Sequence, residues 1–232
     1  MNSPKSDHVE RERRILDAAA ALIMRHGYDK TTMSDVAEEV GVSRGIVYLH
    51  FDSKESLLEA LIHREVLQYV QTWLEHIEAD PRGGTIGGIY RAVLYAINNR
   101  PFMSAVMKRD RRIIGNYLQK PNNMFKALQT PAISVGFLEA LQAAGAIRKD
   151  VNLVMMSHIM DMVSYGLLTI GDFRPLDELP PYEAVMEALA DMMDRLMTPE
   201  DGLDSEAGKA VIRQLAAAAR AQFEQPQQST EK

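Results

Sequence analysis

Apolar residues recur with helical spacing along almost the whole chain, and this periodicity constrains the fold more than any other feature. Near the start, apolar residues lie three and four positions apart, as on one face of a helix. These are Ile15, Ala18, Ala19, Leu22 and Ile23. Further helical patterns are expected at about 85–99, 101–119, 122–145, 151–171, 180–197 and 205–224. No segment alternates convincingly as a half-buried strand would, so the sequence predicts an all-α protein.

Glycine, proline and charged clusters divide these patterns into shorter helices first and longer helices afterwards. Three short helices are expected within residues 1–52, and a longer helix begins near Ser53. We therefore expect an N-terminal domain at 1–52 and a larger helical domain at 53–224, in which 53–78 is a connecting helix. Residues 225–232 are polar and are expected to form a disordered tail.

The composition narrows the functional classes. The chain of 232 residues is 46% hydrophobic and 25% charged, as in globular proteins with a full core. Cysteine is absent, which excludes disulfides and thiolate metal sites, and we predict neither a metal nor a cofactor. No apolar run approaches the roughly 20 residues of a membrane span, and the polar N-terminus carries no signal-peptide core. These features predict a cytoplasmic protein without a membrane partner.

Motifs of common enzymes are missing. The chain contains no HExxH, no G-x-S-x-G and no cysteine nucleophile. Residues 83–88, GGTIGG, faintly resemble a phosphate loop, but they follow a helix and a proline turn instead of a strand. Glu38 and Glu39 are adjacent on a helix and cannot face one another. We therefore predict no catalytic residue and no enzymatic activity.

Residues 31–51 have the order of a helix, a tight turn and a second helix. Thr32 and Asp35 form a capping-box pattern at the start of the first helix, and Gly41 ends it. Ser43 is the expected N-cap of the second helix. A helix-turn-helix of this kind can place its second helix in the major groove of DNA, leading with its N-terminal residues.

The residues that open the second helix suit contacts with DNA. Arg44 could donate two hydrogen bonds to guanine or one to phosphate, and Gly45 would allow a close backbone approach. Tyr48 and His50 could reach phosphates, although both could equally be packing residues. Lys54 begins the next helix, where its charge would add to free amides as a phosphate clamp, unless it is an ordinary solvated charge.

Bulk charge does not favour nucleic acid. The whole chain has a net charge of −6, and residues 1–63 hold 8 Lys and Arg against 11 Asp and Glu. An affinity for DNA must therefore depend on local arrangement, with weak nonspecific binding and a steep dependence on salt.

The segment GYDKTTMSDVAEEVGVSRGIVYLHFDSKESLLEAL resembles the N-terminal domain of the TetR family of bacterial transcription regulators. The resemblance covers about residues 10–62 and rests on these positions: Gly27, Tyr28, Thr31, Thr32, Ala37, Gly41, Val42, Ser43, Tyr48, Phe51, Lys54, Leu57 and Leu58. It implies a homodimeric repressor on a palindromic DNA operator. The DNA-facing candidates it implies are Thr32, Ser43, Arg44, Gly45, Ile46, Tyr48, His50 and Lys54, where Ile46 replaces a threonine common in the family.

The resemblance also implies a ligand cavity in the helical body. Eleven of the 14 methionines lie between 103 and 197, and methionine suits adaptable apolar surfaces, although each could be core filler. His158 and Tyr165 would orient a small apolar effector, while the alternative for His158 is a satisfied core residue. The expected lining is Phe102, Met103, Met107, Met124, Phe125, Phe137, His158, Met162 and Tyr165.

A dimer interface is expected on two long helices. Residues 151–171 are apolar on nearly all sides, as in a helix buried between two partners, and 180–197 carry a continuous apolar stripe. The interface residues we expect are Met156, Met160, Met186, Leu189, Met193, Leu196 and Met197. Basic residues at 108–112 could steer an anionic ligand or touch DNA, although a solvated face is the simpler interpretation.

Two functions of the same fold remain open from the sequence. The first is a repressor released from DNA by a small, largely apolar effector. The second is a DNA-binding regulator that needs no small-molecule ligand and is constitutive or controlled by a protein partner.

Overall fold

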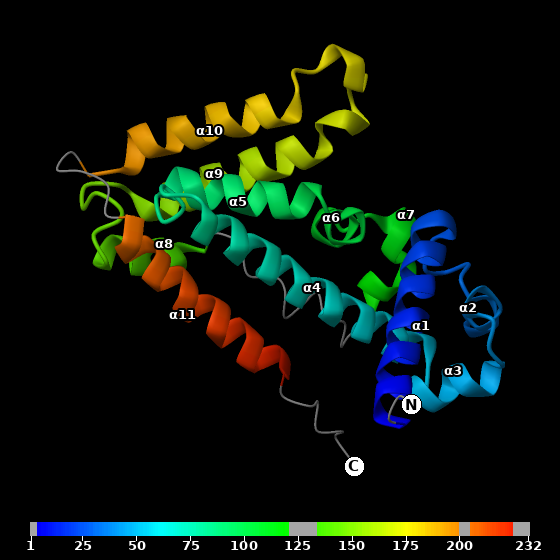
Figure 1. The fold of residues 1–232 in the computed structure, drawn as a ribbon. Coiled ribbons are helices and arrows are strands. Elements are labelled where there is room, and N and C mark those ends of the chain that lie inside the picture. Colours follow the sequence, from blue (N-terminus) through cyan, green and yellow to red (C-terminus); the bar gives the residue numbers. More distant parts are fainter. Residues whose placement is uncertain (1–3, 121–133, 200–204, 225–232) are drawn as a thin grey trace. The chain divides into compact units, whose positions relative to one another are not determined.

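The computed structural model describes residues 4–120, 134–199 and 205–224, and every regular element among them is a helix (Figure 1). This confirms the predicted all-α class. The chain divides into two compact units, one of residues 1–66 with 101–129 and the other of 67–100 with 130–232. The predicted domain boundary at residue 52 stays a prediction, and residues 225–232 lie outside the described part.

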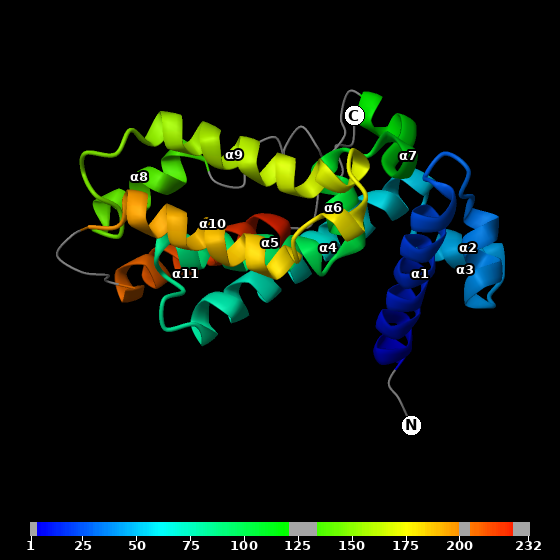
Figure 2. The ribbon, with the colours of Figure 1, turned by 90° about the horizontal axis from the view of Figure 1, so that it is seen from above.

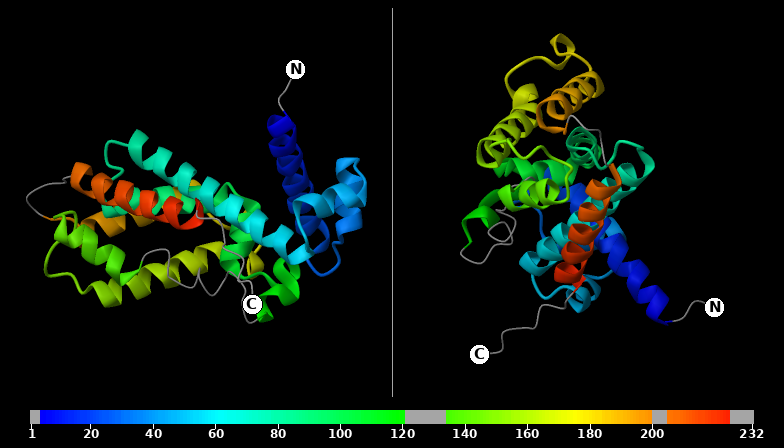
Figure 3. Two further views of the ribbon diagram at one scale, coloured as in Figure 1. Left: turned by 90° about the horizontal axis from the view of Figure 1, so that it is seen from below. Right: turned by 90° about the vertical axis from the view of Figure 1, so that its left-hand side faces the viewer.

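The first unit is built around the N-terminal helices. It contains α1 (Pro4–His26), α2 (Met33–Val40), α3 (Arg44–His50) and the beginning of α4 (Lys54–Ala79), followed by α6 (Pro101–Lys108), α7 (Arg111–Ile114) and the 3-10 helix η1 (Gly115–Gln119). Helix α2 packs against α1 and α3, as the blue and light-blue ribbons show in Figures 1 and 3. The core between them holds Ile15, Ala19, Val36, Val47, Leu58 and Ile62, all nearly or fully buried.

Local sequence signals fix both ends of α2 and the start of α4. The Thr32 hydroxyl accepts a hydrogen bond from the Asp35 amide, and the Asp35 carboxylate accepts one from the Thr32 amide. Gly41 ends α2 at φ 76°, a left-handed conformation that costs glycine little. Ser53 and Ser56 exchange backbone and hydroxyl hydrogen bonds at the start of α4, so Ser53 is the cap there.

The helix predicted at 101–119 is wrong as a single element. It is divided into α6, α7 and η1, because Arg109 adopts φ 51° and Asp110 then caps α7 by accepting from the Arg112 amide. Of the helix predicted at 122–145, residues 121–133 lie outside the described part, and α8 spans Val135–Ala143.

The second unit packs longer helices around a buried α5 (Ile86–Asn98). Its other elements are the end of α4, α8, α9 (Leu153–Thr169), η3 (Ile170–Asp172), η4 (Leu176–Glu178), α10 (Tyr182–Met197) and α11 (Ser205–Glu224). Helix α10 packs along α5, and α8 packs against α9 and α11 (Figure 2). The predicted helices at 85–99, 151–171, 180–197 and 205–224 are confirmed within a few residues.

The glycines at 83–88 serve close packing in this unit. A Cβ on Gly84 would lie 1.7 Å from the backbone oxygen of Ser205, and one on Gly87 would lie 2.3 Å from that of Ala190. The free amides at the start of α5 are used internally, because the Asp194 carboxylate accepts from the Gly87 amide at 2.7 Å. The faint phosphate-loop pattern is therefore a helix-packing element whose anion position is filled by the chain itself.

Helix α9 exposes much of its apolar surface. Residues Leu153–Asp172 are long and apolar enough to cross a membrane by length and composition, with only 17% of the window buried. By length and composition alone, this segment departs from the expectation that no apolar run approaches a membrane span, and core helices of soluble proteins meet the same criterion. This segment was not apparent from the sequence, because the polar residues Ser157, His158, Asp161 and Ser164 interrupt the apolar run.

Candidate nucleic-acid interface

Helix α3 presents its first residues outward and its apolar side inward. Arg44, Gly45 and Tyr48 are exposed, whereas Val47 is fully buried. The Arg44 guanidinium donates to the Tyr48 hydroxyl at 3.1 Å and lies 5.2 Å from the centre of the Tyr48 ring. The two side chains therefore form one exposed pair in which the phenol holds the arginine one helical turn away.

Interactions behind α3 hold it in place. Arg14 of α1 donates to the Val40 carbonyl at 2.7 Å and so satisfies one of the free carbonyls at the end of α2. Phe51, which ends α3, is 6% exposed. These contacts make the turn between α2 and α3 a rigid support for the exposed residues.

Ser43 and Thr32 lie at helix starts but use their hydroxyls differently. Ser43 occupies the N-cap position of α3, yet its side chain makes no capping hydrogen bond. This corrects the expectation that the serine oxygen caps the helix. Thr32 is exposed and its hydroxyl belongs to the capping box with Asp35, where hydrogen bonds from the Thr32 amide and hydroxyl lower the pKa of the Asp35 carboxyl.

Lys54 is engaged with the chain. Its ammonium donates to the carbonyls of Tyr28 at 2.8 Å and Asp29 at 3.3 Å, and it lies 4.2 Å from the centre of the Tyr28 ring. The Tyr28 ring is 4% exposed and packs edge-on against Tyr117 at 6.0 Å. The lysine therefore joins the start of α4 to the turn after α1, and its predicted contact with phosphate stays a prediction.

The remaining predicted residues on α3 lie at its side and end. Ile46 and His50 are half-buried. The His50 ring stacks against His8 of α1, with 4.1 Å between ring centres. Burial, and then the neighbouring His8, lower the pKa of His50.

Sequence reasoning missed Leu49. Its side chain is 82% exposed, so a large apolar group projects from α3 next to Tyr48. Its helical position alone, between residues assigned to the outer face, could have indicated this. An apolar side chain on such a helix can contact the methyl group of thymine.

Comparison with known proteins identifies this arrangement. The family model described as bacterial regulatory proteins, tetR family, matches residues 15–61, which span the second half of α1, all of α2 and α3, and the first turns of α4. The chain belongs to the TetR family. It is accordingly a helix-turn-helix transcriptional regulator.

The similarity to known proteins extends beyond the helix-turn-helix segment. The HTH-type transcriptional repressor KstR2 of Rhodococcus jostii is 24% identical over 212 residues, which cover 87% of this TetR-family chain and all of the relative. The structure of FadR from Bacillus subtilis in complex with stearoyl-CoA is 21% identical with a TM-score of 0.57, covering 78% of this chain and 96% of its own. The ketosteroid regulator KstR2 of Mycobacterium tuberculosis is 18% identical with a TM-score of 0.55, covering 82% and 96%. These two structures share the fold.

The predicted ligand residues of this TetR-family chain fall in both units. In the first unit, Phe102 and Met103 are buried in α6 and Met107 is half-buried, while Met124 and Phe125 lie outside the described residues. In the second unit, Phe137 is buried in α8. The α9 residues His158, Met162 and Tyr165 are exposed instead of enclosed. The predicted cavity stays a prediction.

The predicted interface residues are mostly turned inward. Met160, Met186, Met193 and Met197 are at most 5% exposed in the protomer, so they belong to its core and could not meet a partner there. Met156 and Leu189 are half-buried. Only Leu196 is well exposed, at 49%.

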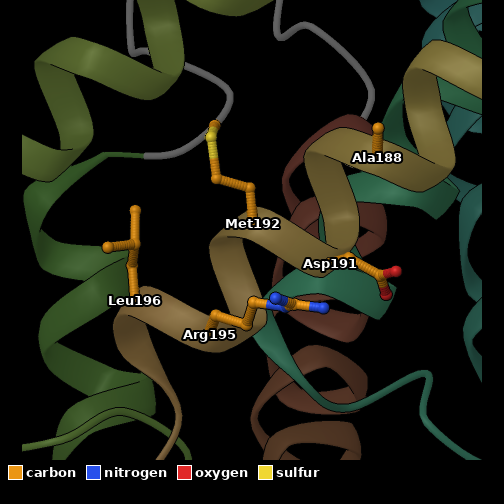
Figure 4. A pocket seen from close by; sticks show the side chains of 5 residues that line it. All are labelled: Ala188, Asp191, Met192, Arg195 and Leu196. Atoms are coloured by element: carbon orange, nitrogen blue, oxygen red, sulfur yellow. The ribbon is translucent and has the colours of Figure 1, made fainter.

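Exposed apolar residues occur at other positions on α9 and α10, next to the predicted ones in the sequence. On α9 they include Met155, Met162 and Tyr165, and on α10 they are Met192 and Leu196. Met192 and Leu196 project from the same side of α10 and border a hollow of about 400 Å³ with Ala188, Asp191 and Arg195 (Figure 4). The apolar face available to a partner is therefore rotated from the predicted one, although the helices are the same.

Proposed function

We propose that this TetR-family chain is a cytoplasmic repressor that binds a palindromic operator as a homodimer and is released by a small, largely apolar effector. The observation that carries the proposal is the exposed pair of Arg44 and Tyr48 at the beginning of α3, held on a rigid helix-turn-helix. An arginine at this position can read guanine with two hydrogen bonds. Leu49 and Gly45 complete a surface with one apolar contact and one close backbone approach.

Phosphate contacts would flank that surface. The start of α4 lies at Lys54, where the Ser56 amide already donates to the Ser53 hydroxyl, and Ser43 carries a hydroxyl that makes no capping bond. Because the helix-turn-helix segment carries more acidic than basic residues, these local donors must supply the electrostatic attraction. We expect affinity to be concentrated on one operator and to fall steeply with salt.

The homodimer is supported by the exposed apolar surface of α9 and α10. Met155, Met162 and Tyr165 on α9 and Met192 and Leu196 on α10 are each 41–60% exposed, and large exposed apolar side chains that gather on one face favour an interaction site. A two-fold axis would bury the same face of both copies, and it would set two α3 helices for the two halves of a palindrome.

The proposed effector has a large apolar part. The similar FadR structure is a complex with stearoyl-CoA, whose acyl chain is a large apolar group, and this supports an apolar effector here. Phe102 and Met103, which are buried in α6, belong to the predicted lining. An effector can release DNA only if it binds one of two head separations more tightly than the other.

Selection of bound sequences from random duplex DNA would find the operator and test the DNA surface. We expect a palindrome, and Arg44→Ala should weaken binding to it by about 1–3 kcal/mol and relax the preference at one base pair of each half-site. Arg13→Ala is the matched control, because this substitution removes the same charge from a residue that is already paired with Glu10 and Asp17 on α1. Equal losses in both variants would refute base reading by Arg44.

Sedimentation at micromolar concentration would test the dimer. The wild-type chain of 26.0 kDa should sediment with twice that mass, and Leu196→Glu should shift it toward the monomer. Val9→Glu is the control. Val9 is 67% exposed on α1, and the substitution adds the same charge away from α9 and α10. A monomeric wild type would remove the proposal of a homodimer.

A thermal-shift screen of apolar, aromatic and cationic compounds would separate the two remaining functions. A true effector should stabilise the protein and lower its affinity for the operator. The operator should lower the protein's affinity for the effector by the same factor. If no compound across a broad set stabilises the protein, the regulator that needs no small molecule is favoured.

A further inference from the structure

Three potential metal ligands converge where α1 passes the end of α3. His8 and Glu12 lie one turn apart on α1, and His50 is the last residue of α3. One potential ligand atom from each side chain lies within 4.8 Å of the others. The His8 Nδ1 is 3.9 Å from a Glu12 carboxylate oxygen, and the rings of His8 and His50 are tilted by 37° with 4.1 Å between centres.

Hydrogen bonding leaves one of these rings free for another role. The Nδ1 of His50 is buried and has no hydrogen-bond partner among the described atoms. A buried nitrogen without a hydrogen-bond partner is unfavourable, so each case calls for an explanation. The His50 ring contacts the rings of His8 and Phe51. Because Nδ1 makes no hydrogen bond, none would have to break if this nitrogen coordinated an ion.

We propose that His8, Glu12 and His50 bind one divalent transition-metal ion, with Zn²⁺ as the best fit. Two imidazoles and one carboxylate are a usual protein ligand set for Zn²⁺, and the fourth position would hold water. Cu(I) is disfavoured because the three residues include no thiolate. Ca²⁺ is disfavoured because they offer too few oxygen ligands. The sequence did not predict this site, because position 50 is distant from 8 and 12 along the chain.

The required movement is small. Zinc bonds of about 2.0–2.1 Å in a tetrahedron place neighbouring donors about 3.4 Å apart, so the present separations must shrink by at most about 1.4 Å. The side chains of His8 and Glu12 are 59% and 44% exposed, which leaves both free to rotate toward His50. The bound ion would then tie α1 to the end of α3 opposite Arg44, and it would withdraw His50 from contact with DNA.

Metal titration of the full-length, tag-free protein tests the site directly. After treatment with a chelator, calorimetry with Zn²⁺ should show one ion per chain, and Co²⁺ should give the visible absorption of a tetrahedral site. Losing a residue that merely orients a ligand lowers metal affinity by about 10- to 100-fold, so His50→Gln and Glu12→Gln should each lower it by at least about 100-fold. His26→Gln is the matched control, since it removes an exposed histidine at the far end of α1.

The mutants also decide the location of the ion. Zn²⁺ should raise the melting temperature of the wild type and of His26→Gln, and this rise should vanish in Glu12→Gln. Should His50→Gln fail to fold, His8→Gln takes its place, because His8 is exposed and its loss leaves no cavity. The proposal is overturned if the wild type takes up no Zn²⁺, or if the Glu12→Gln and histidine variants of the cluster bind it as tightly as the wild type.

Discussion

Replacing Asp194 by asparagine should destabilise the second unit well beyond a surface substitution. Asp194 lies on α10 and is 7% exposed. One carboxylate oxygen accepts from the Gly87 amide at 2.7 Å, and the other accepts from Arg82 at 2.5 Å and from the Thr85 hydroxyl at 3.2 Å. The carboxylate thereby closes the start of α5 and fixes α10 along it.

The magnitude follows from these partners. The asparagine amide keeps one acceptor oxygen but turns an NH₂ group toward another donor, so one charge-assisted hydrogen bond of about 1.5–3 kcal/mol is lost. The negative charge at the N-terminus of α5 contributes about 0.3–1 kcal/mol more. We therefore expect Asp194→Asn to lower the free energy of unfolding by about 2–4 kcal/mol.

The neighbouring Asp191 provides the control. It lies one turn earlier on α10, 3.9 Å from Arg82, with its side chain 56% exposed. An exposed pair of this kind contributes about 0–1 kcal/mol, so Asp191→Asn should be nearly neutral. Urea unfolding followed by circular dichroism, at fixed protomer concentration, measures both. Equal stability of Asp194→Asn and wild type, or equal damage from the two variants, would refute the internal capping of α5.

Other variants probe the first unit and the glycine contact. Lys54→Met keeps the stem over Tyr28 but loses a charged hydrogen bond, and urea unfolding should show a loss of about 1–2 kcal/mol. Gly84→Ala should lower the melting temperature, because its Cβ would meet a backbone oxygen at 1.7 Å, whereas Gly136→Ala, with nothing within 4 Å, should raise it slightly. The pKa of Asp35 is lower in the folded protein than unfolded, so its contribution to stability is full above the unfolded pKa near 3.8 and is lost as the pH falls through the folded value. An acid titration of Asp35→Asn should therefore show a weaker loss of stability below about pH 4 than the wild type, and an identical acid profile would contradict this role.

Short-range signals predicted the helix-turn-helix well. The capping box of Thr32 and Asp35 depends on residues three apart, and Gly41 ends its helix through its own φ angle. Such interactions are visible in a sequence because both partners lie in one turn. The division at Arg109 was missed, because a positive φ at a residue other than glycine or asparagine leaves no compositional signal.

Long-range partners and helix orientation were not predictable in the same way. The contact of Lys54 with Tyr28 joins residues 26 positions apart, and no local pattern distinguishes it from a solvated lysine. On α9 and α10, methionine occurs at adjacent positions such as Met192 and Met193, of which one is exposed and the other fully buried. Apolar character alone assigned these helices to an interface but could not say which side faces a partner.

Asp161 near the middle of α9 bears on the choice between protein and lipid as a solvent for this helix. At the centre of a bilayer-spanning helix an aspartate costs about 2.5–3.5 kcal/mol, about as much as six leucines return. Here it lies half-buried, and desolvation already raises the pKa of its carboxyl. Within α9, Asp161 thus opposes insertion of a helix that otherwise has the length and composition of a membrane span.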